Sequence, residues 1–274
     1  MNDFVATPAH GAAWITGASS GIGRAVALAL ARKGFTVCVT ARNEQSLIAL
    51  AEEAKTSGGK IIPMAGDVTS SEDMDHIVTS IMAHHKALAL VIFNAGIYLP
   101  VDVAHMKVET FQQTFDVNLT GVVNGLVPAI DAMKQAGRGQ IAIVSSVTGY
   151  GGLPTSSAYG ATKAALINMA ESLKFDLDKL GIRIQIINPG FVDTPATENN
   201  AFTMPALISV DEAAQSIMAG LRRNGFEITF PRRFTYVLKA LQFLPYRAYF
   251  AVINRATGWK NRPVDGGSSA QSAP

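Results

Sequence analysis

Short apolar runs alternate along the chain with longer segments in which apolar residues recur at helical spacing. The runs predict strands and the periodic segments predict helices, and their regular alternation favours a parallel sheet with helices on both faces. Runs such as residues 141–144 are continuously apolar, which is typical of strands covered on both sides. We therefore expect an α/β, doubly wound, Rossmann-like sheet of seven strands. The expected strands are 12–16, 35–40, 60–64, 88–93, 140–145, 182–187 and 226–230, and the expected helices are 22–33, 43–57, 71–85, 107–135, 157–180 and 210–223.

A glycine-rich loop separates the first expected strand from the first expected helix. Strand, glycine turn and helix in this order are the context that a dinucleotide-binding motif requires. Gly17 allows a tight turn, Gly21 lets the backbone approach a pyrophosphate, and Gly23 lets the helix pack close to the strand. The helix N-terminus then offers free N–H groups and a positive dipole end to an anion.

A tyrosine and a lysine stand four residues apart at the start of the expected helix 157–180. On a helix Tyr159 and Lys163 share a face, so the lysine charge can act on the tyrosine hydroxyl. A free tyrosine has a pKa of about 10, and a neighbouring cation favours the phenolate and moves that pKa toward neutrality. The pair predicts a general acid–base site, although this spacing alone also occurs on ordinary helix faces.

The chain resembles the main single-domain class of short-chain dehydrogenases/reductases over roughly residues 10–230. The resemblance rests on an ordered set of motifs with the family's spacings, namely the glycine loop, Asn94-Ala-Gly96, Asn118, Ser146, Tyr159, Lys163 and Asn188-Pro-Gly190. It implies the strand order 3-2-1-4-5-6-7. It does not define the substrate, because this family acts on steroids, sugars, ketoacyl chains and many small ketones.

The resemblance also implies a role for each of four catalytic candidates. Tyr159 would donate a proton to a substrate carbonyl oxygen as hydride arrives at its carbon, and Ser146 would orient that oxygen. Lys163 would lower the pKa of Tyr159 and hold the nicotinamide ribose. Asn118 would hold a water that links Lys163 to solvent, or alternatively it is only a polar residue at a helix kink.

The residues at the end of the second expected strand indicate which nicotinamide cofactor the protein prefers. In dinucleotide-binding folds an acidic residue there binds the adenosine ribose 2′-hydroxyl. Here Ala41 takes that position and Arg42 follows, so a guanidinium can pair with a 2′-phosphate and NADP(H) is favoured over NAD(H). Ser19 can add a contact to that phosphate. The cofactor-binding residues that the resemblance implies are Gly17, Ser19, Ser20, Gly21, Ile22, Gly23, Arg42, Asp67, Val68, Asn94, Ala95, Gly96, Tyr159, Lys163, Pro189, Gly190, Val192 and Thr194.

Residues expected near the substrate are mostly apolar. Tyr150, Leu153 and Pro154 flank the catalytic serine, and residues 196–207 are expected to form a lid. We therefore expect an NADP(H)-dependent oxidoreductase that interconverts a carbonyl and an alcohol, with an apolar ketone, aldehyde or alcohol as substrate. The alternative is a non-catalytic NADP(H)-binding regulatory protein, but such relatives usually lack the tyrosine or the lysine, and this chain has both.

Composition and charge limit the partners, metal sites and location that we expect for the protein. The chain has 274 residues, 48% of them apolar, and a net charge of +2, which is ordinary for one globular domain and indicates no nucleic-acid partner. The lone Cys38 excludes an intrachain disulfide, and no Cys/His cluster has zinc spacing, so we expect no metal site. The absence of a secretory signal and of a long apolar stretch favours a cytoplasmic location. By resemblance we expect a homodimer or homotetramer, with the helices near 107–135 and 157–180 at the contact.

The C-terminal segment differs from the rest in charge. Residues 222–262 hold nine basic residues and one acid, Glu227. We expect a single domain over residues 1–262, with a basic helical extension from about residue 231, and a disordered tail over 263–274. The extension predicts two amphipathic helices, Phe234–Leu244 and Tyr246–Thr257. Their apolar faces are expected to cover the substrate pocket or form a subunit contact; the alternative is peripheral binding to a membrane.

Overall fold

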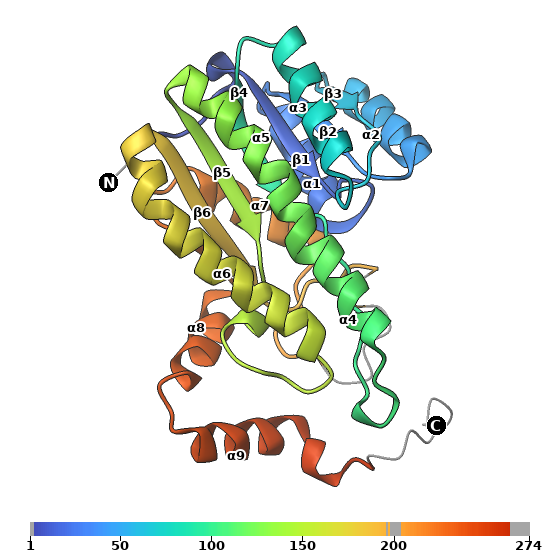
Figure 1. Ribbon diagram of the computed structural model, residues 1–274, viewed down its shortest axis with the longest axis vertical. Coiled ribbons are helices and arrows are strands. Elements are labelled where there is room, and N and C mark those ends of the chain that lie inside the picture. The colour runs from blue at the N-terminus through green and yellow to red at the C-terminus, as the bar shows by residue number, and fades with distance from the viewer. Residues whose placement is uncertain (1–2, 196, 198–203, 264–274) are drawn as a thin grey trace.

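The protein is built around one seven-stranded sheet in the order β3-β2-β1-β4-β5-β6-β7, and every neighbouring pair of strands is parallel (Figure 1). The computed structural model describes residues 3–195, 197 and 204–263. The predicted fold class and strand order are confirmed. The strands are β1 (Ala12–Thr16), β2 (Thr36–Thr40), β3 (Lys60–Pro63), β4 (Leu88–Phe93), β5 (Gly139–Val144), β6 (Ile182–Pro189) and β7 (Glu227–Phe230).

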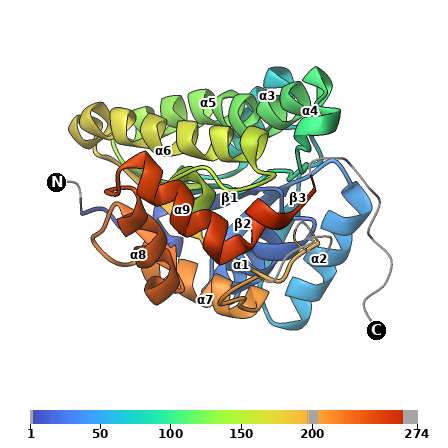
Figure 2. The ribbon, with the colours of Figure 1, turned by 90° about the horizontal axis from the view of Figure 1, so that it is seen from below.

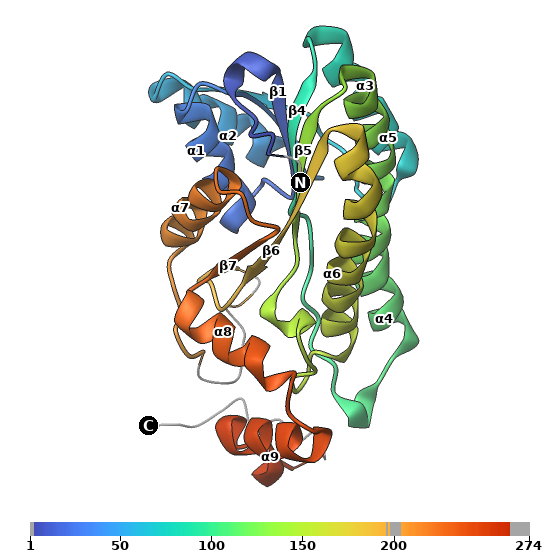
Figure 3. The same cartoon turned by 90° about the vertical axis from the view of Figure 1, so that its left-hand side faces the viewer.

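Helices cover both faces of this sheet, as the alternating pattern predicts. One face carries α1 (Gly21–Arg32), α2 (Glu44–Thr56) and α7 (Val210–Leu221), and the opposite face carries the other central helices (Figure 3). The helices of that second face are α3 (Ser71–His84), α4 (Val108–Phe115), α5 (Gly121–Ala136) and α6 (Ser157–Leu177).

The central strands are apolar throughout because both of their faces are covered. Every residue of β1, β4, β5 and β6 is buried. Alternate residues of one strand therefore enter different cores: Ile15 packs with α1, α2 and α7, whereas its neighbour Trp14 packs with α3 and α5. These two cores hold the strand ends rigidly, and the polar residues that follow the strands are placed by that framework.

Two predicted helices differ in detail from the pattern. The segment 107–135 is interrupted by a π-helical turn over Asp116–Thr120, between α4 and α5. Such turns shift the helical register and are frequent at functional sites. The segment 157–180 is α-helical to Leu177 and ends in a short 3₁₀ turn, Asp178–Leu180.

Two further helices lie beyond the carboxyl ends of the strands. They are α8 (Arg232–Leu241) and α9 (Tyr246–Thr257), and α9 forms one extremity of the molecule (Figures 1 and 2). The first begins two residues before and ends three residues before the predicted Phe234–Leu244, while the second has the predicted bounds. Among the described residues no helix is long and apolar enough to cross a bilayer. The predicted disordered tail, apart from Pro263, and most of the predicted lid (residues 196 and 198–203) lie outside the described residues.

Candidate active site

The glycine loop between β1 and α1 has no room for side chains at two of its glycines. Gly17 has a φ of +68°, and a Cβ there would lie 2.6 Å from the Cα of Ala95. A Cβ on Gly23 would lie 2.4 Å from both the Gly17 carbonyl oxygen and the Asn94 side-chain nitrogen. The loop therefore packs directly on the end of β4, and only glycine at these positions permits that approach.

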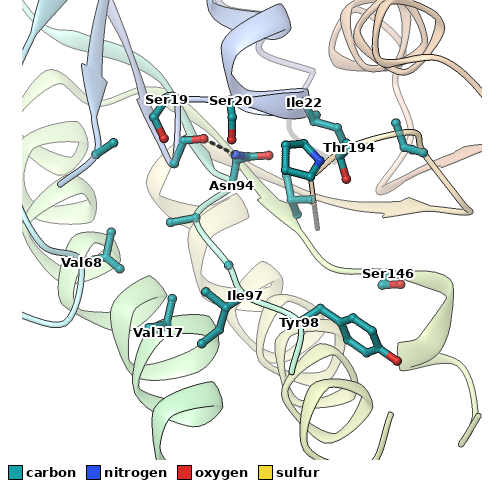
Figure 4. A pocket seen from close by; sticks show the side chains of 18 of the residues that line it. Ser19, Ser20, Ile22, Val68, Asn94, Ile97, Tyr98, Val117, Ser146 and Thr194 are labelled. Atoms are coloured by element: carbon teal, nitrogen blue, oxygen red, sulfur yellow. Dashed lines mark hydrogen bonds between the residues drawn. The ribbon is translucent and has the colours of Figure 1, made fainter. Parts of the chain in front are cut away.

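Asn94 ties the ends of two neighbouring strands together. Its side-chain Nδ2 donates to the carbonyl oxygens of Thr16 (3.2 Å) and Gly17 (2.9 Å), and its backbone N–H donates to the Thr16 hydroxyl (3.1 Å). Figure 4 shows its side chain pointing toward the glycine loop, close to Ser19 and Ser20. Asn94 therefore fixes the glycine loop against β4.

Lys163, on the first turns of α6, is buried with its ammonium group held by the backbone. Its Nζ donates to the Val144 carbonyl oxygen at 2.9 Å, and only 3% of the residue is exposed. The neighbouring Ser145 donates to the Lys163 carbonyl oxygen (2.8 Å), so this serine anchors the helix at the edge of the cavity that it also lines. Burial lowers the pKa of Lys163 from 10.5 to about 8.

Tyr159 lies one turn before Lys163, packed against Tyr98. The two tyrosine rings meet edge to face with centroids 5.2 Å apart, and the Lys163 Nζ is 5.3 Å from the Tyr159 ring centroid. Burial raises the pKa of Tyr159 to about 12, while a hydrogen bond with the Ser146 hydroxyl opposes that rise. The lowering of this pKa by Lys163 that the sequence predicts stays a prediction, because in the protein without its cofactor burial is the largest influence and acts in the opposite direction.

Asn118 sits in the π-helical turn and is completely buried. Its Oδ1 accepts from the Ile97 N–H (2.8 Å), and its Nδ2 donates to the Ile97 carbonyl oxygen (2.9 Å) and to the Thr162 hydroxyl at 3.4 Å. The amide thus clamps the loop after Gly96 to α6. A Cβ added at Gly96 would lie 3.3 Å from Asn118 Oδ1 and 3.6 Å from the Lys163 Nζ, so this loop passes directly over both side chains.

One elongated cavity of about 450 Å³ joins these elements along the carboxyl edge of the sheet. It runs from the glycine loop and Arg42 to Tyr159 and Lys163. Of the predicted site residues, only Gly23 and Asn118 are absent from its wall, because each packs behind it. The predicted residues that line it are Gly17, Ser19, Ser20, Gly21, Ile22, Arg42, Asp67, Val68, Asn94, Ala95, Gly96, Ser146, Tyr159, Lys163, Pro189, Gly190, Val192 and Thr194.

A second cavity, of about 350 Å³, adjoins the first. The two share Tyr98, Ser146, Tyr159, Gly190 and Thr197 in their walls. The wall of the second is largely apolar and includes inward-facing residues of α8 and α9. These further wall residues include Leu153, Pro154, Phe191, Pro205, Phe234, Leu238, Ile253 and Trp259. The expectation that the C-terminal helices cover a pocket therefore agrees with the structure.

Tyr150 does not line this second cavity, unlike Leu153 and Pro154 with which it was grouped from the sequence. Its hydroxyl donates to Glu227 at the start of β7. Lys239 of α8 pairs with the same carboxylate, and the Asn188 side chain donates to it at 2.6 Å. Burial would raise the pKa of Glu227, but these hydrogen bonds outweigh it and hold that pKa below 4.5.

The family follows from a match along most of the chain: a sequence model described as short chain dehydrogenase matches residues 11–204. The chain belongs to this family. This short-chain dehydrogenase is 34% identical over 243 residues to an uncharacterised oxidoreductase of Myxococcus xanthus, covering 89% of this chain and 96% of the relative. It is also 34% identical over 184 residues to a 3-oxoacyl-[acyl-carrier-protein] reductase of Thermotoga maritima, covering 67% and 75% of the two chains.

Solved structures agree with this assignment. A short-chain type dehydrogenase/reductase from Mycobacterium marinum superposes with a TM-score of 0.74 at 29% identity, covering 79% of this short-chain dehydrogenase and 92% of the other chain. A 3-ketoacyl-ACP reductase from Sinorhizobium meliloti superposes with a TM-score of 0.71 at 29% identity, covering 80% and 96%. The fold and membership of an oxidoreductase family thus rest on both sequence and structure.

Sequence reasoning about this short-chain dehydrogenase missed Tyr98 and Glu227. Tyr98 stands between the two cavities, and its hydroxyl is 2.9 Å from that of Thr155. Its position two residues after Gly96 was the available signal. In the sequence Glu227 is the single acid of a basic segment. That position could have indicated its role, because a buried carboxylate needs cationic or hydrogen-bonding partners and the segment supplies cations. Within the described residues, no cluster of His, Cys, Asp or Glu could hold a metal ion.

Proposed function

We propose that this short-chain dehydrogenase is an NADP(H)-dependent enzyme that interconverts a carbonyl and an alcohol on an apolar substrate. The observation that carries the proposal is the position of Tyr159 and Ser146, which lie in the walls of both cavities. A group held in the elongated cavity and a group held in the apolar cavity would meet at the Tyr159 hydroxyl. Relatives named as 3-oxoacyl-[acyl-carrier-protein] reductases support the reduction of a carbonyl.

The elongated cavity suits a dinucleotide. The glycine loop brings the N-terminus of α1 to its wall, where free N–H groups favour a pyrophosphate. At the opposite end, Lys163 has three N–H donors and the bond to Val144 uses one of them, which leaves donors for ribose hydroxyls. Arg42 and Ser19, both in the wall near the glycine loop, would hold a 2′-phosphate and so favour NADP(H). When bound there, the nicotinamide would supply or accept the hydride.

Tyr159 is suited to donate a proton. With its pKa raised to about 12, the phenol is neutral at physiological pH, and a neutral hydroxyl can hydrogen-bond a substrate carbonyl and then release its proton to the developing alkoxide. Ser146, already bonded to this hydroxyl, would orient the same oxygen. The Lys163 cation, 5.3 Å from the centroid of this ring, would stabilise the resulting phenolate.

Asn118 is proposed as a positioning residue. Through its three hydrogen bonds it holds the Ile97 backbone and thereby Gly96 against Lys163, which keeps the ammonium at one place. The water relay that the family resemblance implies for Asn118 stays a prediction.

The apolar second cavity supports a hydrophobic ketone, aldehyde or alcohol as the substrate class. Phe191, Phe234 and Leu238 contribute large apolar surfaces to its wall, and burying such surfaces provides affinity of roughly 25 cal/mol per Å². Arg262 is its only charged wall residue among the described residues.

We also propose a homo-oligomer. Apolar side chains stand exposed on the helices that the family resemblance places at a contact, among them Val127 on α5 and Phe175 on α6, the latter 76% exposed. A second copy that packs α5 and α6 against the same helices across a two-fold axis would cover these side chains. A strict monomer in sedimentation at micromolar concentration would contradict this part of the proposal.

A panel of apolar ketones, aldehydes and alcohols, assayed with each cofactor, tests the function. We expect NADPH oxidation with at least one apolar ketone, and faster turnover with NADPH than with NADH. Tight NADPH binding in a titration with no turnover on any member of the panel would contradict an enzyme and support the regulatory alternative.

A further inference from the structure

The corner between α8 and α9 carries large apolar side chains that the fold leaves exposed. Phe243 is 87% exposed and Tyr246 is 81% exposed, one on each side of Pro245. Phe250 follows one turn later and stacks on Tyr246 with ring centroids 6.1 Å apart. We call this set the aromatic corner; its members are Tyr236, Val237, Phe243, Leu244, Tyr246 and Phe250.

The inward faces of the same helices already account for the docking of α8 and α9 on the protein. Phe234, Leu238 and Ile253 line the apolar cavity, and the Tyr249 hydroxyl donates to the Gly152 carbonyl oxygen at 2.9 Å. The sequence places Val237, Tyr246 and Phe250 on these same apolar stripes, but the structure turns them outward. The aromatic corner is therefore not needed to cover the cavity.

The charges around the corner have one sign. Residues 231–263 include seven basic residues and no acidic one. Lys239 is paired with Glu227 of β7, and Arg262 lies over the Trp259 ring and lines the apolar cavity, whereas the other five are exposed at the surface of the extension. These exposed cations are Arg232, Arg233, Arg247, Arg255 and Lys260.

We propose that the aromatic corner docks this protein on the surface of an anionic phospholipid bilayer. Aromatic side chains favour the boundary between headgroups and acyl chains, and arginines beside them are attracted to anionic lipids. A second copy fits this face poorly, because a two-fold contact would bring the same cations together. The corner is also accessible to a flat surface, because α9 lies at the extremity of the molecule (Figures 2 and 3).

Docking in this way has a consequence for the cavities. The helices that bear the corner also form part of the wall of the apolar cavity through Phe234 and Ile253. Lipid binding therefore places this cavity at the bilayer surface, where apolar small molecules are concentrated.

Flotation of the full-length protein with vesicles tests the proposal. The probes are vesicles of phosphatidylcholine alone and of phosphatidylcholine with phosphatidylserine, at low ionic strength. We expect the wild-type protein to float only with the anionic vesicles. The double variant Phe243→Ser/Tyr246→Ser should bind them at least about tenfold more weakly, because it removes two apolar side chains from the bilayer contact. The matched control is Ile48→Ser on α2, which removes an exposed apolar side chain from the face of the sheet opposite the proposed subunit contact and should bind as the wild type does.

A second pair of variants tests the role of charge. Arg247→Glu/Arg255→Glu should lose the preference for anionic vesicles, whereas Arg32→Glu, at the far end of α1, should retain it. Sedimentation and NADPH binding of every variant, measured without vesicles, should match the wild type and so report intact folding.

Three results would overturn the proposal. The first is no flotation of the wild-type protein with anionic vesicles. The second is equal weakening by Ile48→Ser and by Phe243→Ser/Tyr246→Ser. The third is a corner variant that changes the oligomeric state while vesicle binding is unchanged, which would identify the corner as a contact between protein chains.

Discussion

Replacing Arg42 by alanine should affect the binding of NADPH and of NADH differently. Arg42 lines the elongated cavity directly after Ala41, where a dinucleotide-binding fold that prefers NAD(H) has an acidic residue. The guanidinium is proposed to pair with the 2′-phosphate, which NADPH has and NADH lacks. Arg42→Ala should therefore weaken NADPH binding selectively.

The size of the effect follows from the exposure of the side chain. A hydrogen bond to a charged group contributes about 1.5–3 kcal/mol, and exposure to solvent reduces that value through screening. Because Arg42 is exposed, we expect a loss near the low end, about 1.4 kcal/mol, which corresponds to roughly tenfold in Kd. The loss should shrink as salt is added. Ala41→Asp combined with Arg42→Ala should further shift the preference toward NADH.

Fluorescence titration of each variant with NADPH and with NADH measures the effect. The matched control is Arg32→Ala, which removes the same charge from an exposed position at the end of α1, outside the cavity wall. This control should leave both Kd values unchanged. Equal losses of NADPH and NADH affinity in Arg42→Ala would refute the specificity argument, as would an equal NADPH loss in Arg32→Ala.

Two further predictions concern buried charges. Burial lowers the pKa of Lys163 from 10.5 to about 8, so between these pH values the unfolded chain binds more protons than the folded protein. In urea denaturation, the free energy of unfolding of the cofactor-free wild type relative to Lys163→Met should therefore rise by up to about 3 kcal/mol from pH 8 to pH 10. A difference that does not change with pH would contradict the shift. Glu227→Ala removes the carboxylate that Asn188 and Lys239 contact, and should lower the free energy of unfolding by about 1–3 kcal/mol. It should also speed hydrogen exchange in α8 and raise KM more than it lowers kcat. The control Glu52→Ala, which breaks an exposed pair with Lys55, should change none of these quantities.

The sequence predicts the sheet and the position of the site well because both depend on patterns of neighbouring residues along the chain. Continuous apolar runs such as Ile141–Val144 can be stable only between two covered faces, so they locate the central strands. In a parallel sheet the residues that follow these strands share one edge, which explains why Asn94, Ser146 and Gly190 line one cavity.

Features that depend on distant contacts could not be predicted in the same way. The π-helical turn interrupts a segment whose periodicity indicates one helix, and it coincides with the clamp that Asn118 makes on Ile97. The raised pKa of Tyr159 depends on burial beneath Tyr98, which the spacing to Lys163 does not show. Tyr150 was expected to face the substrate because it adjoins Ser146 in the sequence, but its hydroxyl bonds to Glu227, 77 residues away.

The measurement that tests the central proposal most directly is the single-turnover rate of Tyr159→Phe with bound NADPH and an apolar ketone. The phenylalanine ring preserves the packing against Tyr98 and removes only the hydroxyl that is proposed to donate the proton. We expect the rate to fall by about 10²–10⁴-fold, with the Kd for NADPH nearly unchanged. A rate close to that of the wild type, on a substrate for which the chemical step is rate-limiting, would contradict the proposal.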